Sequence, residues 1–89
     1  MPPSLRRLSP KKRPDIREVL ALNMISMRNE RGWSQDALAL EAGLHRTFIA
    51  HVERRSRNIS LDSLERIAVA LNVLTHELLV PHQKTVESS

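Results

Sequence analysis

Three polar side chains between positions 46 and 51 could contact another molecule from one side of a helix: Arg46, Thr47 and His51. An arginine can donate two parallel hydrogen bonds to O6 and N7 of guanine, and a threonine offers a hydroxyl and a methyl group to a base edge or a phosphate. His51 follows Thr47 by about one helical turn and can donate or accept a hydrogen bond. These groups are suited to reading bases in the major groove of DNA. A phosphate contact or a solvated position is the alternative for each of them.

A predicted helix of about residues 46–54 must position these side chains. Its inward positions are apolar at helical spacing: Phe48, Ile49 and Val52. A shorter amphipathic segment precedes it, with apolar residues at Ala37, Leu38 and 40–42. Gly43 separates the two segments, and glycine favours a left-handed helix end because it has no Cβ. The pattern predicts a helix, a tight turn and a second helix, and this unit is too small to bury its own apolar faces.

A further helix is predicted before this unit. Asp15 can cap a helix that runs to about Arg31 and stops at Gly32. Its apolar stripe comprises Val19, Leu20, Met24 and Met27, with Ile16 as an extension. Ser34 is a good N-cap for the next helix, and Trp33 before it is expected in the core, as a hydrophobic staple to Leu38.

Two more helices are predicted after residue 59. Ser60 caps the first of them, Asn72 ends it, and its expected buried stripe is Leu61, Leu64, Ile67, Ala68 and Leu71. Thr75 is expected to cap a last short helix through Leu79, because Pro81 opposes its continuation. No segment reads as a strand. The sequence therefore predicts an all-α, compact five-helix domain over residues 15–80.

Both ends of the chain are predicted to be flexible. Residues 1–14 hold four prolines and five of the 14 basic residues and no acid, so they read as a basic arm. This arm is either a disordered tail or a segment that follows the DNA backbone or enters the minor groove. Residues 81–89 read as a disordered tail. Without cysteine or an apolar run of about 20 residues, the sequence favours neither disulfides nor a membrane span, and we expect a cytoplasmic protein.

The helix-turn-helix segment resembles a known family. Ser34-Gln35, Leu38-Ala39, Gly43-Leu44, Ile49 and Glu53 resemble the helix-turn-helix of phage repressors and XRE-type bacterial regulators. The segments 46–49, 52–54 and 56–58 look particularly like controller proteins of restriction–modification systems. The resemblance covers roughly Leu20 to Leu79 and implies a lambda-repressor-like fold that binds double-stranded DNA. Arg46, Thr47 and His51 match the base-reading positions of the family.

The resemblance also implies contacts to the DNA backbone. Gln35 would donate to a phosphate, and the loop after the recognition helix would grip the backbone through Arg54, Arg55, Ser56, Arg57 and Asn58. Residues 45–58 carry a local charge of +3, which favours such contacts, although a solvated basic loop is the alternative. His45 stands where the family usually has Ser, Thr or Asp as N-cap. Because histidine caps poorly, this helix start is expected to be weaker, or His45 touches a phosphate instead.

Two structural expectations follow from the same resemblance. Arg28 and Glu53 would form a largely buried ion pair, and Ile25 departs from the basic residue that relatives often carry there. The apolar residues near the end of the domain would build a homodimer interface: Leu74, Leu78, Leu79 and Val80. The alternative is that Leu74 and Leu78 simply close the core of one chain.

An enzymatic function is not expected. The four histidines lack the spacing of a zinc site, no serine lies in a nucleophile motif, and two glycines cannot form a phosphate-cradling loop, so we expect no metal, cofactor or small-molecule ligand. The sequence predicts a DNA-binding transcriptional regulator, a homodimer on a palindromic operator, autoregulatory or controlling a restriction–modification operon. The alternatives are an antitoxin or a protein-interaction module with the same fold.

Overall fold

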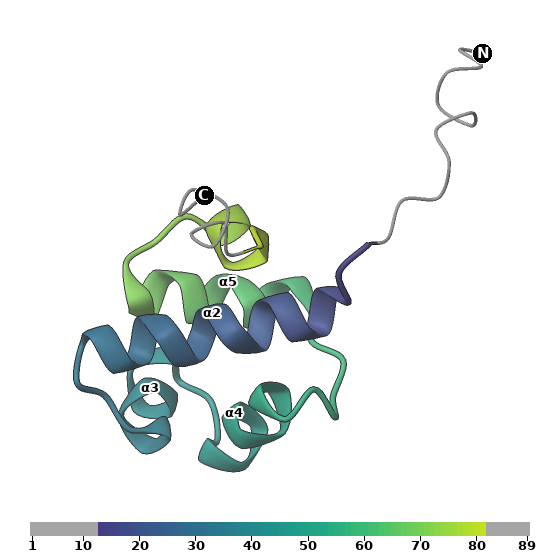
Figure 1. The fold of residues 1–89 in the computed structure, drawn as a ribbon. Helices are drawn as coiled ribbons and strands as arrows, with labels where there is room; N and C mark the ends of the chain where they lie inside the picture. The colour runs from purple at the N-terminus through teal and green to yellow at the C-terminus, as the bar shows by residue number, and fades with distance from the viewer. Residues whose placement is uncertain (1–12, 82–89) are drawn as a thin grey trace, which may run out of the picture.

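Four α-helices and one short 3₁₀ helix make up the part of the chain that the computed structural model describes, residues 13–81 (Figure 1). The elements are α2 (Ile16–Glu30), α3 (Gln35–Ala42), α4 (Arg46–Glu53), α5 (Leu61–Leu71) and the 3₁₀ helix η1 (Thr75–Leu79). No strand occurs within residues 13–81, and the all-α prediction is confirmed for them. Most of the predicted basic arm and of the C-terminal tail lies outside the described residues.

α2 holds the other elements together. Figure 1 shows α2 between the pair formed by α3 and α4 and the short η1, and α2 contacts both α4 and η1. α3 packs against α4 and α5, and η1 also packs on α5. The buried asparagine of α2, Asn23, strengthens this arrangement, because its Nδ2 donates to the carbonyls of Leu78 and Val80 at 2.9 Å each. The amide thereby fixes η1 on α2.

One apolar core joins these elements. Its fully buried members come from all five helices: Met24, Leu38, Ile49, Val52, Ile67, Leu71 and Leu78. Trp33 is half-buried and packs against this core, and Met27 does the same. None of the helices within residues 13–81 is long and apolar enough to cross a membrane.

The helix ends follow the caps expected from the sequence. The side chains of Asp15, Ser34 and Ser60 each accept a hydrogen bond from a first-turn N–H, at 3.0, 3.0 and 3.1 Å. Gly43 has a φ of +70° and closes the turn between α3 and α4, as predicted. Asn72 ends α5 with a φ of +60°, a conformation that asparagine tolerates better than most residues.

Three expectations differ from the structure. The last element is a 3₁₀ helix that begins after Leu74, whose N–H donates to the Glu77 carboxylate at 2.8 Å, so Thr75 lies inside it and caps nothing. The five-helix count therefore resolves into four α-helices and a 3₁₀ helix. Leu61 is 81% exposed and Leu40 is 80% exposed, because no neighbouring element covers them. Leu78 is fully buried within the chain and closes its core, so it does not present a surface to a second copy.

Candidate nucleic-acid interface

α4 is fixed by one face and presents polar side chains on the other. Ile49 and Val52 are buried in the core, whereas Arg46 and Thr47 at the start of the helix are exposed. His51 is half-buried one turn later. The structure thus leaves the first turn of α4 accessible to a large partner, while its opposite face anchors the helix.

Arg46 forms an ion pair on the surface of the domain. Its Nε lies 3.2 Å from Oδ1 of Asp36 in α3, and both side chains are well exposed, at 61% and 74%. An exposed ion pair of this kind contributes at most about 1 kcal/mol, because water and salt screen it. The pair therefore holds the Arg46 side chain near the first turn of α3, and it is weak enough to be exchanged for another partner.

The N-terminus of α4 has no side-chain cap. His45 occupies the N-cap position with extended backbone angles, yet its ring accepts no hydrogen bond from the first turn. His45 is exposed. The first N–H groups of a helix attract anions when no side chain satisfies them, so this end of α4 is compatible with a phosphate contact.

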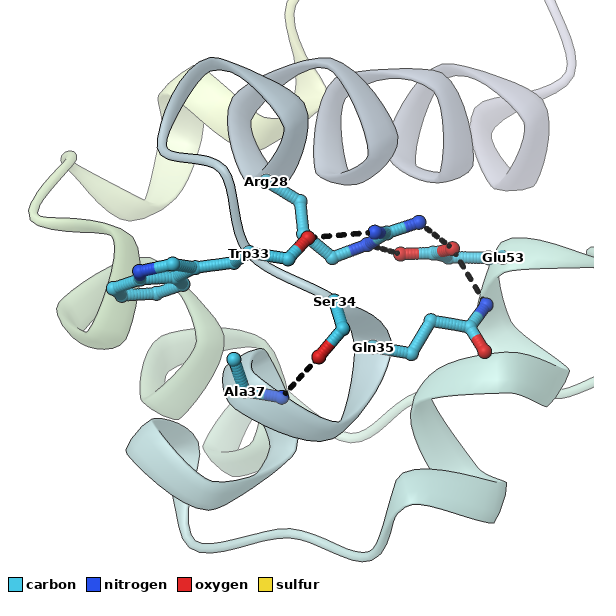
Figure 2. Close-up of polar contacts among 6 residues, drawn as sticks. All are labelled: Arg28, Trp33, Ser34, Gln35, Ala37 and Glu53. Atoms are coloured by element: carbon cyan, nitrogen blue, oxygen red, sulfur yellow. Dashed lines mark hydrogen bonds and ion pairs between the residues drawn. The ribbon is translucent and has the colours of Figure 1, made fainter.

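A buried polar network joins α2, α3 and α4 (Figure 2). Nε and Nη2 of Arg28 donate to the two carboxylate oxygens of Glu53 at 2.8 and 2.9 Å, and the third donor, Nη1, reaches the Trp33 carbonyl at 2.9 Å. The two paired side chains are only 13% and 4% exposed. The hydrogen bonds that Arg28 donates to the Glu53 carboxylate raise the pKa of Arg28, so the guanidinium stays charged.

Gln35 takes a role in this network that the sequence did not suggest. Its Nε2 donates to Oε1 of Glu53 at 2.9 Å, as Figure 2 shows. The side chain therefore links the first turn of α3 to the last residue of α4. An amide nitrogen carries two hydrogens, so one donor remains for a phosphate.

The loop between α4 and α5 contains the residues that were predicted to contact the DNA backbone. All of its residues from 54 to 58 are exposed. The guanidinium of Arg57 lies 5.7 Å from the centre of the Phe48 ring, within the range of a cation–π contact. Oδ1 of Asn58 accepts from Nε and Nη2 of Arg17, at 3.1 and 2.7 Å. Sequence reasoning missed Arg17, because 41 residues separate it from Asn58 and no spacing pattern relates them.

α3 and α4 form a two-helix unit with a left-handed glycine in its turn, and α4 exposes its first turn. This arrangement is that of a DNA-binding domain of the helix-turn-helix class. The chain belongs to the XRE-type helix-turn-helix family, whose pattern matches residues 24–78. This family binds double-stranded DNA and regulates transcription, and its members named below are regulators rather than enzymes.

Two curated relatives illustrate the membership. The Neisseria hypothetical transcription factor of Neisseria meningitidis serogroup B is 45% identical over 73 residues, which cover 82% of this chain and 69% of the relative. The control protein C.SmaI of Serratia marcescens is 49% identical over 65 residues, which cover 73% of this chain and 77% of the relative.

Solved structures agree with the fold. The crystal structure of the Neisseria transcription factor superposes with a TM-score of 0.77 at 42% identity, covering 90% of this chain and 95% of the other. The restriction–modification controller protein C.AhdI from Aeromonas hydrophila gives a TM-score of 0.67 at 34% identity, covering 70% of this chain and 94% of the other. Controller proteins are therefore among the relatives of this chain, as its motifs indicated.

Proposed function

We propose that this chain recognises a specific operator by inserting the first turn of α4 into the major groove of double-stranded DNA. The observation that carries the proposal is the exposure of Arg46 and Thr47 on a helix whose other face is fixed in the core. Arg46 reads guanine by two parallel hydrogen bonds, Thr47 contacts a base edge or a thymine methyl, and His51 reads a base further along the groove.

The residues around α4 hold the DNA backbone. The free amide hydrogen of Gln35 and the uncapped end at His45 donate to phosphates on one side. The exposed loop residues contact phosphates on the other side: Arg54, Arg55, Ser56 and Arg57. These contacts position α4 and make the affinity depend on salt, but they carry little sequence information.

The working unit is a homodimer on a palindromic operator. Two-fold protein symmetry matches two half-sites, and a single small recognition helix reads too few bases alone. Leu74 and Val80, which flank η1, are 63% and 46% exposed and supply apolar surface for the second copy, together with the half-buried Leu79. Kinship with control proteins such as C.SmaI supports control of a restriction–modification operon or of the chain's own gene.

A second candidate is a regulator that also binds a partner protein, such as an antitoxin or an interaction module. The observation that favours it is the strong exposure of Leu40, Leu61 and Val69, between 72% and 81%. These three apolar side chains are exposed at single positions and are not shown to form one patch. DNA recognition is therefore the preferred candidate.

Fluorescence anisotropy on the DNA upstream of the chain's own gene, against a scrambled duplex and across a salt series, tests the proposal. The double variant Arg46→Ala with Thr47→Ala should lose most of its preference for the operator over the scrambled duplex and retain salt-sensitive affinity. Arg66→Ala removes one exposed charge from α5 and should keep the preference for the operator. Intact preference in the double variant would refute the assignment of these residues, and equal weak binding by the unmodified chain would favour the partner-protein candidate.

A further inference from the structure

A polar pocket lies between the N-terminal end of α2 and the loop that follows α4. Its volume is about 240 Å³, and its lining consists of five residues: Arg17, Arg55, Ser56, Arg57 and Asn58. Figure 1 shows this loop beside the N-terminal end of α2. Two segments distant in sequence thus bring three arginines around one hollow.

The pocket has three positive charges and no acid in its lining. Among residues 13–81, none of these three arginines forms an ion pair, whereas Arg28, Arg31 and Arg46 do. Like charges repel each other, so their convergence costs free energy unless an anion binds among them. The pocket is therefore electrostatically suited to a group with a negative charge.

Asn58 orients Arg17 without neutralising it. Both contacts go to a neutral oxygen, Oδ1 of Asn58, and use two of the five guanidinium N–H groups. The remaining three donors stay available in a fixed plane, which suits the oxygens of a phosphate. Asn58 thus acts as a positioning residue for Arg17 rather than as a phosphate ligand of its own.

The opposite rim of the pocket is attached to the recognition helix. Ser56 donates to the carbonyl of His51 from its N–H at 3.0 Å and from its Oγ at 3.1 Å. Arg55 adopts a φ of +61° at the end of α4, where glycine is the usual residue. An anion held between Arg17 and this rim would consequently fix the C-terminal end of α4 relative to α2.

From these observations we infer that the pocket binds a phosphate of the DNA backbone and that Arg17 is one of its ligands. The inference rests on the proposed function, because it assumes that α4 enters the groove beside that phosphate. It adds α2 to the surface that holds the operator. A free phosphate would offer the same chemistry, so the test must separate the two sources.

The first experiment compares Arg17→Ala with the unmodified chain by anisotropy across a salt series. Arg17→Ala should weaken binding to operator and scrambled duplex alike, by about tenfold, which is the loss expected for one charged hydrogen bond. The slope of log affinity against log salt should become shallower by about one unit. An unchanged affinity and slope in Arg17→Ala would overturn the inference while the unmodified chain still prefers its operator, so this failure differs from a failure of the proposed function.

Single methylphosphonate substitutions in the operator identify the source of the phosphate. One such substitution should weaken binding of the unmodified chain more than it weakens binding of Arg17→Ala, because the neutralised phosphate is the partner of Arg17. Titration of the DNA-free chain with inorganic phosphate, followed by the NMR signals of the arginine Nε–H groups, provides the other arm. Saturation by free phosphate, with every methylphosphonate affecting both proteins equally, would overturn the inference in favour of a free-anion site.

Arg55→Gly separates binding from folding. Glycine adopts the positive φ of this position without the steric cost of a side chain, so the melting temperature should rise. The same variant lacks one guanidinium of the pocket and should bind DNA about tenfold more weakly. A rise in melting temperature with unchanged DNA affinity would remove Arg55 from the pocket and contradict the inference.

Discussion

The carboxylate of Glu53 connects three helices. The residue as a whole is 8% exposed and lies at the end of α4. Its carboxylate accepts hydrogen bonds from Arg28 of α2 and Gln35 of α3. A buried carboxylate is costly unless its charge and its lone pairs are satisfied, and here both are. The network therefore fixes the C-terminal end of α4 against α2 and α3.

Replacing Glu53 by glutamine should lower the free energy of unfolding by about 3–5 kcal/mol, because the charge of Arg28 then remains buried without its counterion. Urea denaturation followed by circular dichroism measures the change. Glu41→Gln, on the exposed face of α3, is the matched control and should stay within about 0.5 kcal/mol of the unmodified chain. The double variant Arg28→Met with Glu53→Gln should lose less than the single one. A loss below about 1 kcal/mol for Glu53→Gln would show that the pair is not buried in solution.

At the scale of the element, caps and turns that depend on residues nearby in the sequence were predicted. Burial and pairing that depend on residues distant in the sequence were not. The caps at Ser34 and Ser60 and the turn at Gly43 are local, because each side chain or φ acts within four residues, and these were predicted. Leu61 has the right spacing for the buried stripe of α5, yet it is exposed because burial requires a neighbour in space. The pairing of Arg17 with Asn58 was missed for the same reason.

Among the four α-helices of residues 13–81, only α4 has no side-chain cap at its N-terminus, and His45→Ser should strengthen this end. Serine can accept a hydrogen bond from the first turn, as Ser34 and Ser60 do, so the free energy of unfolding should rise by about 1 kcal/mol. Ser34→Ala provides the opposite reference and should lower it by a similar amount. Both changes are measured by thermal and urea denaturation. Equal or lower stability in His45→Ser would show that the ring of His45 already stabilises this end of the helix.

At the scale of the whole molecule, the apolar residues near the end of the domain divide between two tasks. Leu78 is fully buried and held in place by the contact of its own carbonyl with Asn23, so it belongs to the core of one chain. Leu74 and Val80 lie on either side of η1 and remain largely exposed. The sequence could not distinguish these residues, because all of them are apolar and close together. Their different exposure makes the dimer proposal specific to Leu74 and Val80.

Leu74→Glu and Val80→Glu should each convert a homodimer into monomers, because a second copy would have to bury the new carboxylate without a partner. Sedimentation equilibrium measures the mass, and operator titrations should lose cooperativity in parallel. Leu61→Glu and Val69→Glu change even more exposed positions of α5 and should leave the mass unchanged. Leu78→Ala should instead lower the free energy of unfolding by about 2–5 kcal/mol, as expected for a core leucine. If the unmodified chain sediments as a monomer at micromolar concentration, two copies would meet only on the DNA. Leu74 and Val80 would then have to contact another partner.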